Sequence, residues 1–315
     1  MTLGDPIGAL PGEIAELYPF QPSLLSLGNE HMSYLDEGDR ALPPLVLVHG
    51  VLGWSFLWRK VIPHVTDSYR VVAPDNIGSG LSSKPNSRSY HTLDRHIENL
   101  TVLIESLGLE NITLVLHGWG GPIGLGYAVR HPENVARLLL INSWAGPPSG
   151  AGYPPLPSRI RRFCSAWFPR RIVDTASRFL IRRELRRDVA TPMPDAVMRG
   201  YLHPFKEING CMALWTFTYF AGAPAGSDSR AALEGIEAKL GEIKAPVEVL
   251  WGMRNPLFGG VMRPFLLRDS FPDGRGPFLR PDAGHLLPED DPQAVVERLL
   301  AQPEQPGQPP FRILQ

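Results

Sequence analysis

The chain has 315 residues, a formal net charge of −1, 43% hydrophobic residues and 20% charged residues. This length allows a large core without disulfides or metals, and the near-zero net charge excludes a global field that selects nucleic acid or a membrane surface. The first residues lack the basic and apolar regions of a signal peptide, and no apolar run is long enough to cross a bilayer, so we expect a cytoplasmic protein. The two cysteines, Cys164 and Cys211, are interpreted as reduced and buried. No Cys/His cluster has metal-ligand spacing, so we expect neither metal nor cofactor.

Strands and helices alternate along most of the chain. Polar and apolar residues alternate around Gly28-Asn29, which predicts a hairpin over residues 23–27 and 31–35. Apolar runs predict buried strands at 44–49, 69–74, 112–116, 135–141, 247–251 and 278–280. Helical spacing predicts helices at 56–65, 91–107, 261–270 and 292–300, with Thr92 as an N-cap and Gly108 as a stop. This order predicts an α/β fold with a mostly parallel sheet, whose ligands bind at the carboxyl ends of the strands.

The pattern changes after residue 145. Residues 146–157 are rich in Pro, Gly and Ser, and residues 158–222 read as helices only, with breaks at Pro169, at residues 192–194 and at Pro204. We interpret residues 146–235 as an inserted helical cap. The core is then formed by residues 18–145 and 236–302, and residues 1–17 and 303–315 are expected to wrap the surface.

The stretch from Ile112 to Gly121 reads as a buried strand, a very tight turn and a helix packed on that turn. This arrangement is a nucleophile elbow, which raises one side chain above a sheet among backbone N–H groups. The tip of such an elbow is Ser, Cys or Asp. Here it is Gly118, which has no side chain.

Five segments resemble one family in the same order. They are His49-Gly-Val-Leu-Gly-Trp-Ser-Phe56, Pro74-Asp-Asn-Ile-Gly-Ser-Gly-Leu-Ser-Ser-Lys-Pro85, Val115-Leu-His-Gly-Trp-Gly-Gly121, Leu250-Trp-Gly-Met-Arg-Asn-Pro256 and Asp282-Ala-Gly-His285. They resemble segments of the α/β-hydrolase superfamily, and within it of the haloalkane dehalogenases and the β-lactone decarboxylases of long-chain olefin biosynthesis. The resemblance spans about residues 18–300 and implies an α/β-hydrolase fold with an inserted helical cap.

The resemblance also implies a site. In these families an Asp attacks carbon to form an ester, a His activates water, an acid orients that His, and paired donors hold the leaving anion. The corresponding positions are Gly118, His285, Asn255, and the donors Val51 and Trp119. The nucleophile is therefore lost, the acid has become a neutral amide and one donor has become apolar. His285, Trp119 and the backbone N–H groups of Val51 and Trp119 remain, and Asn255 can hold the imidazole but cannot stabilise an imidazolium.

No other residue replaces the nucleophile convincingly. Ser79 is interpreted as a turn residue, and Ser143 and Asp75 as loop residues near the rim of the site. His117 is expected to point back into the sheet. Glu289 is interpreted as a surface residue or a charge at a helix start.

Aromatic residues favour a hydrophobic pocket, although each of them is also an ordinary core residue. Trp54, Trp58 and Trp144 surround the predicted site, and residues 214–220 of the cap are strongly aromatic. The predicted substrate contacts are Val51, Trp54, Gly118, Trp119, Trp144, Trp215, Phe217, Leu257 and Phe258.

The cap is locally basic. Only Asp174 and Glu184 oppose its arginines, which are Arg159, Arg161, Arg162, Arg170, Arg171, Arg178, Arg182, Arg183, Arg186 and Arg187. This run is either a solvated face or a dock for an acidic partner, such as a carrier protein delivering an acyl chain, or for an anionic membrane.

Three functions remain open. The first is a repurposed enzyme that acts on a hydrophobic, polyketide-like small molecule of secondary metabolism without a covalent nucleophile, by cyclisation, elimination, isomerisation or lyase-type cleavage. His285, Asn255 and Trp119 would carry that reaction, through shape, desolvation and weak acid–base help. The second is a non-catalytic binding or scaffold protein. The third is a hydrolase of haloalkanes, epoxides, lactones or esters that uses water activated by His285.

Overall fold

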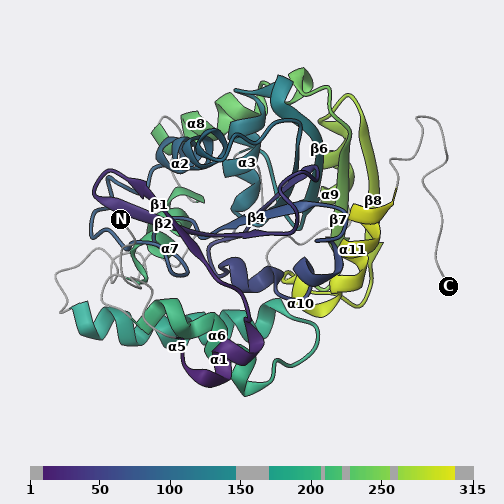
Figure 1. Ribbon diagram of the computed structural model, residues 1–315. Helices are drawn as coiled ribbons and strands as arrows, with labels where there is room; N and C mark the ends of the chain where they lie inside the picture. Colours follow the sequence, from purple (N-terminus) through teal and green to yellow (C-terminus); the bar gives the residue numbers. More distant parts are fainter. Residues whose placement is uncertain (1–9, 147–169, 207–209, 222–227, 256–261, 302–315) are drawn as a thin grey trace.

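The computed structural model describes residues 10–146, 170–206, 210–221, 228–255 and 262–301, which form one central sheet with helices around it (Figure 1). The strands of the described residues lie in the order β1-β2-β4-β3-β5-β6-β7-β8. They are β1 (Ser23–Leu27), β2 (Glu30–Glu37), β3 (Pro44–Val48), β4 (Arg70–Pro74), β5 (Ile112–His117), β6 (Val135–Ile141), β7 (Val247–Gly252) and β8 (Gly274–Arg280). The pairs β1–β2 and β2–β4 are antiparallel, and all other pairs are parallel. The predicted fold class is confirmed.

The sheet is buried on both faces because its central strands are apolar throughout. In β3, Val46 and Val48 pack into the apolar cluster on one face, whereas Leu45 and Leu47 pack into the cluster on the other. The first cluster includes residues of α2 (Leu93–Ser106), α3 (Gly120–Ala128), α8 (Asp228–Glu237) and α9 (Arg263–Asp269). The second includes residues of the 3₁₀ turns η1 (Ser55–Trp58) and η2 (Ile62–His64), and of α10 (Leu287–Asp290) and α11 (Pro292–Leu300).

Local signals fix the ends of several elements. Gly28 adopts φ +72° in the turn between β1 and β2, as the predicted hairpin requires. The Thr92 side chain accepts a hydrogen bond from Arg95 N and caps α2. Gly108 adopts φ +59° just after that helix. The predicted hairpin and the predicted limits of α2 are confirmed.

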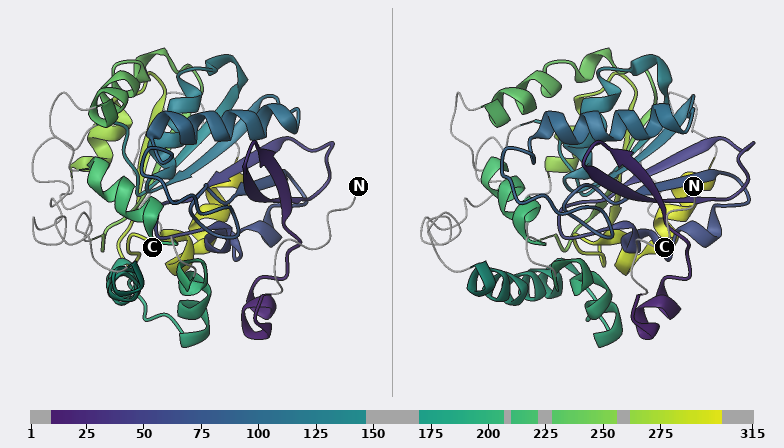
Figure 2. Two further views of the ribbon diagram at one scale, coloured as in Figure 1. Left: turned by 90° about the vertical axis from the view of Figure 1, so that its left-hand side faces the viewer. Right: turned by 60° about the vertical axis from the view of Figure 1, so that its left-hand side comes forward.

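The cap helices lie beside the sheet. Figures 1 and 2 show α5 (Arg170–Asp188) and α6 (Asp195–Leu202) together along one side of the molecule, next to α1 (Gly12–Leu17). The helix α7 (Met212–Ala221) follows the short 3₁₀ turn η4 (His203–Lys206). Helix α8 packs against α2 and α3 over the sheet, although it spans the predicted cap boundary at residue 235. The domain boundaries stay a prediction.

Two local expectations differ from the structure. The helix expected at 56–65 is instead the pair of turns η1 and η2, because Pro63 removes a backbone donor and the flanking residues are aromatic or β-branched. Strand β8 begins four residues before the expected Phe278. Residues 12–17, which we expect to wrap the surface, form the short helix α1, which is mostly exposed and buries Ile14. Cys211 is buried as expected, whereas Cys164 lies outside the described residues.

Candidate active site

The elbow has its expected backbone geometry. β5 ends at His117, Gly118 adopts φ +53°, and α3 begins at Gly120. A β-carbon placed on Gly118 would lie 3.5 Å from Nε2 of His285 and 3.4 Å from Cα of Gly50. The position of the missing side chain therefore faces the imidazole directly.

His285 lies on the loop between β8 and α10 and is held through its backbone. Nε2 of His117 donates to the carbonyl oxygen of His285 at 2.9 Å, so His117 does turn back beneath the site. Nδ2 of Asn142 donates to the same carbonyl at 2.9 Å and to Gly284 O at 2.8 Å. Burial lowers the pKa of His285 well below its usual range, and the neighbouring His117 lowers it further. The imidazole of His285 is therefore neutral near pH 7.

The turn that carries Asn255 lies beside the histidine loop. Arg254 N donates to Ala283 O at 2.9 Å, and Oδ1 of Asn142 accepts from Gly252 N at 2.9 Å. Asn142 therefore bonds both turns from its position after β6. Asn255 itself is buried.

Trp119 presents donors next to Gly118. Its ring contacts Trp144 at a centroid distance of 5.1 Å and Phe217 of α7 at 4.9 Å, which brings three predicted contact residues together. Its buried Nε1 has no hydrogen-bond partner in the described parts of the chain. The backbone N–H groups of Val51 and Trp119 also donate no hydrogen bond to an acceptor in the described parts of the chain. These three N–H groups therefore have no acceptor among the described residues.

Other predicted contact residues lie elsewhere. Trp54 stacks on Phe56 in the cluster on the opposite face, and its Nε1 donates to Gly200 O of α6 at 3.1 Å. Trp215 donates its Nε1 to Ser177 Oγ of α5 at 2.9 Å. The predicted contacts Leu257 and Phe258 fall outside the described residues.

The residues considered as alternative nucleophiles form hydrogen bonds with the backbone. Ser143 Oγ donates to Gly118 O at 2.7 Å. Ser79 N donates to Asn76 O within a turn, as expected. We expect Asp75 near the rim of the site, but it is fully buried. Its carboxylate accepts hydrogen bonds from the backbone N–H groups of Ser55 (2.7 Å) and Leu81 (2.8 Å), which satisfy the buried group.

Comparisons with known proteins identify the family. The sequence profile of the α/β hydrolase fold matches residues 43–187. A haloalkane dehalogenase of Mycobacterium marinum is 33% identical over 272 residues, covering 86% of this chain and 88% of that protein. The chain belongs to the α/β-hydrolase fold family. A cis-3-alkyl-4-alkyloxetan-2-one decarboxylase of Shewanella oneidensis is 30% identical over 301 residues, covering 90% of this chain and 88% of that protein.

Solved structures of this family agree. A tetrameric haloalkane dehalogenase of Paraglaciecola agarilytica superposes with a TM-score of 0.75 at 26% identity, covering 91% of this chain and 94% of that one. An α/β hydrolase fold protein of Burkholderia ambifaria superposes with a TM-score of 0.72 at 25% identity, covering 89% and 99%. The relatives with named activities are enzymes, both dehalogenases and decarboxylases.

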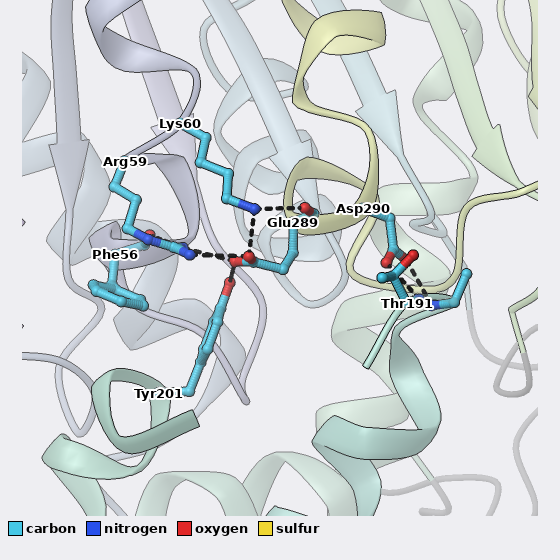
Figure 3. Close-up of polar contacts among 8 residues, drawn as sticks. Phe56, Arg59, Lys60, Thr191, Tyr201, Glu289 and Asp290 are labelled. Carbon is cyan, nitrogen blue, oxygen red and sulfur yellow. Dashed lines mark hydrogen bonds and ion pairs between the residues drawn. The ribbon is translucent and has the colours of Figure 1, made fainter. Parts of the chain in front are cut away.

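The interpretation of Glu289 as a surface residue is wrong, although it does lie in the first turn of α10. Glu289 is only 8% exposed, and its carboxylate accepts two hydrogen bonds from Arg59 at 2.7 and 2.9 Å (Figure 3). Tyr201 OH of α6 donates to it at 2.9 Å, and Lys60 Nζ lies 2.7 Å from it. The available signal is Arg59, which together with Lys60 interrupts the apolar stretch from Phe56 to Ile62, because a buried charge needs a partner.

The basic character of the cap is partly visible. Arg183, Arg186 and Arg187 of α5 are exposed, and Glu184 pairs with Arg183 at 3.1 Å and with Arg187 at 3.5 Å. Side-chain positions are outside the described set for Arg159, Arg161, Arg162, Arg170 and Arg171. The acidic carrier partner stays a prediction. Among the described residues no helix is long and apolar enough to cross a membrane, and no group of three His, Cys, Asp or Glu is placed to hold a metal ion.

Proposed function

We propose that this α/β-hydrolase-fold chain is an enzyme that acts on a hydrophobic small molecule without a covalent enzyme intermediate. The observation that carries the proposal is the elbow itself. Gly118 retains the φ of +53° and faces Nε2 of His285, yet it has no atom that can attack. The hydroxyl of Ser143 and the carboxylate of Asp75 are held by the backbone.

The remaining groups suit a reaction within one substrate molecule. Neutral His285 can take up or return a proton, although Asn255 gives no charge to stabilise an imidazolium. The N–H groups of Trp119 and Val51 can stabilise a developing oxyanion. The aromatic side chains of Trp119, Trp144 and Phe217 favour an apolar substrate.

Lyase-type cleavage fits these groups better than hydrolysis. Decarboxylation of an alkyl oxetanone, as in the name of the Shewanella relative, yields an alkene and carbon dioxide and consumes no water. Negative charge grows on the departing carboxyl oxygen, next to which the donors of Trp119 and Val51 would lie. Cyclisation, elimination and isomerisation share this independence from water.

A panel of alkyl oxetanones, epoxides and haloalkanes in H₂¹⁸O tests the proposal. We expect organic products without ¹⁸O, and we expect Trp119→Phe, which removes the indole N–H, to lower kcat about 100-fold. An organic product that carries one ¹⁸O from the solvent contradicts the proposal and identifies hydrolysis; carbon dioxide is not scored, because it exchanges oxygen with water.

Hydrolysis by water is the second candidate. Its support is the open position at Gly118, where a nucleophilic water would lie beside Nε2 of His285. Saturable binding with no turnover of any substrate in the panel would instead identify a non-catalytic binding protein.

A further inference from the structure

Two neighbouring carboxylates directly follow the histidine loop. His285 is followed by the short helix α10, whose last residues are Glu289 and Asp290. Both side chains contact the cap as well as the core (Figure 3). The loop of His285 is therefore bonded to elements that come from far apart in the sequence.

Asp290 joins the histidine loop to the end of α5. Its Oδ2 accepts from Gly284 N at 2.8 Å and from Ala190 N at 2.9 Å, and its Oδ1 accepts from Thr191 N at 3.1 Å. One carboxylate thus holds the residue before His285 and two residues of the link between α5 and α6.

A second set of contacts holds the other side of His285. Leu286 N donates to Asp188 O, the last residue of α5, at 2.9 Å. A β-carbon at Gly284 would lie 2.5 Å from that same oxygen, so only glycine allows the two backbones to approach this closely. The backbone on both sides of His285 is therefore fastened to the cap.

Glu289 joins the same loop to α6 and to the core. Its carboxylate receives Arg59 and Lys60 from the segment after β3, and Tyr201 from α6. Burial raises the pKa of Glu289, but Arg59 and Lys60 outweigh it, so the pKa lies below its usual value and the group is charged. Withdrawal of Tyr201 with the cap would leave this buried charge with one donor fewer.

We propose that Glu289 and Asp290 are positioning residues that make the placement of His285 depend on the docking of the cap. This rests on the proposed role of His285 in catalysis. When α5 and α6 are docked, Nε2 of His285 faces Gly118. When they move away, the N–H groups of Gly284 and Leu286 lose their partners, and the loop keeps only the core contacts to His117 and Asn142, which fix the imidazole less tightly. Substrate entry and proton transfer are then coupled through one loop.

Amide hydrogen exchange and the imidazole resonances of His285 test this without any need for turnover. The ring resonances are assigned with His285→Gln. In Asp290→Asn a neutral amide with one acceptor oxygen replaces a charged carboxylate that accepts from three backbone N–H groups, so we expect exchange at Gly284 and Leu286 at least about tenfold faster and a shifted His285 ring. Asp36→Asn is the matched control, because Asp36 is also a partly buried, paired carboxylate, bonded to Arg70 at the opposite end of the sheet.

Tyr201→Phe is the milder second variant and decides the question by itself if Asp290→Asn does not fold. It removes one donor to Glu289, and we expect about fivefold faster exchange at Gly284 and Leu286. Its control is Tyr127→Phe on α3, which removes a hydroxyl that accepts a hydrogen bond from Asn134 Nδ2. Wild-type exchange rates and His285 resonances in a folded Tyr201→Phe overturn the proposal. If the exchange rates and the His285 resonances change as expected but the protein lacks the proposed activity, the coupling between cap and histidine loop still stands and only the proposed function fails.

Discussion

Replacing Gly118 by Asp should return a nucleophile to the elbow. The β-carbon position has its nearest contacts at 3.4 and 3.5 Å, so a β-carbon fits there without displacing backbone. The positive φ of +53° costs a residue other than glycine about 1–2 kcal/mol. For a chain of this size that cost lowers Tm by roughly 2–8 °C, which leaves a folded protein.

The assay is intact-protein mass spectrometry after exposure to a 1-bromoalkane. The carboxylate of Gly118→Asp displaces bromide and forms an alkyl ester, which adds the mass of the alkyl group. Combining the variant with His285→Gln removes the base that would activate water, so the ester should accumulate. The wild-type chain should gain no such mass.

Gly235→Asp is the matched control, because residue 235 is exposed with open space around it and receives the same carboxylate. Ester formation confined to residue 118 supports the elbow geometry. A folded Gly118→Asp variant that forms no ester, with or without His285, would refute the statement that this position faces the reacting end of the site.

Three further changes have defined outcomes. Glu289→Gln leaves the buried Arg59 without its carboxylate and should cost about 3–5 kcal/mol in urea unfolding; a cost below about 1 kcal/mol would contradict the structural role of that charge. Burial raises the pKa of Asp188 to about 8, so the folded state favours its protonated form and stability falls as pH rises from about 4 to 8. Asp188→Asn should therefore stabilise the protein at pH 9 by up to about 5 kcal/mol but hardly at pH 4, and equal effects at both pH values would exclude this linkage. Asn255→Asp, added to Gly118→Asp, should speed ester hydrolysis by orders of magnitude by stabilising the imidazolium of His285, as time courses of bromide release will show.

The fold could be predicted because its signals are local. Apolar runs such as residues 112–116 give a doubly buried strand, and Thr92 and Gly108 mark the limits of α2 through backbone chemistry that their neighbours do not alter. The region after residue 55 was harder, since Pro63 interrupts an otherwise helical spacing and tightens the chain into 3₁₀ turns.

The candidate site could be predicted only in part. Motifs place Gly118 and His285 at the ends of strands, and parallel strands bring those ends together. The partners of Glu289 are 230 residues away at Arg59 and 88 away at Tyr201, and no periodicity encodes such a pairing. For the same reason the sequence could not show that Trp54 gives its N–H to Gly200 of the cap.

Asn142 joins the two turns of the site through their backbone atoms. Its amide bonds Gly252 N, Gly284 O and His285 O, all of which are backbone atoms. Because these hydrogen bonds use main-chain atoms of the two turns, they do not depend on which side chains the turns carry. The side chains at residues 118 and 255 can therefore change while these hydrogen bonds to the backbone remain. New side chains can therefore be introduced at these positions one residue at a time while the bonds of Asn142 to the two turns remain.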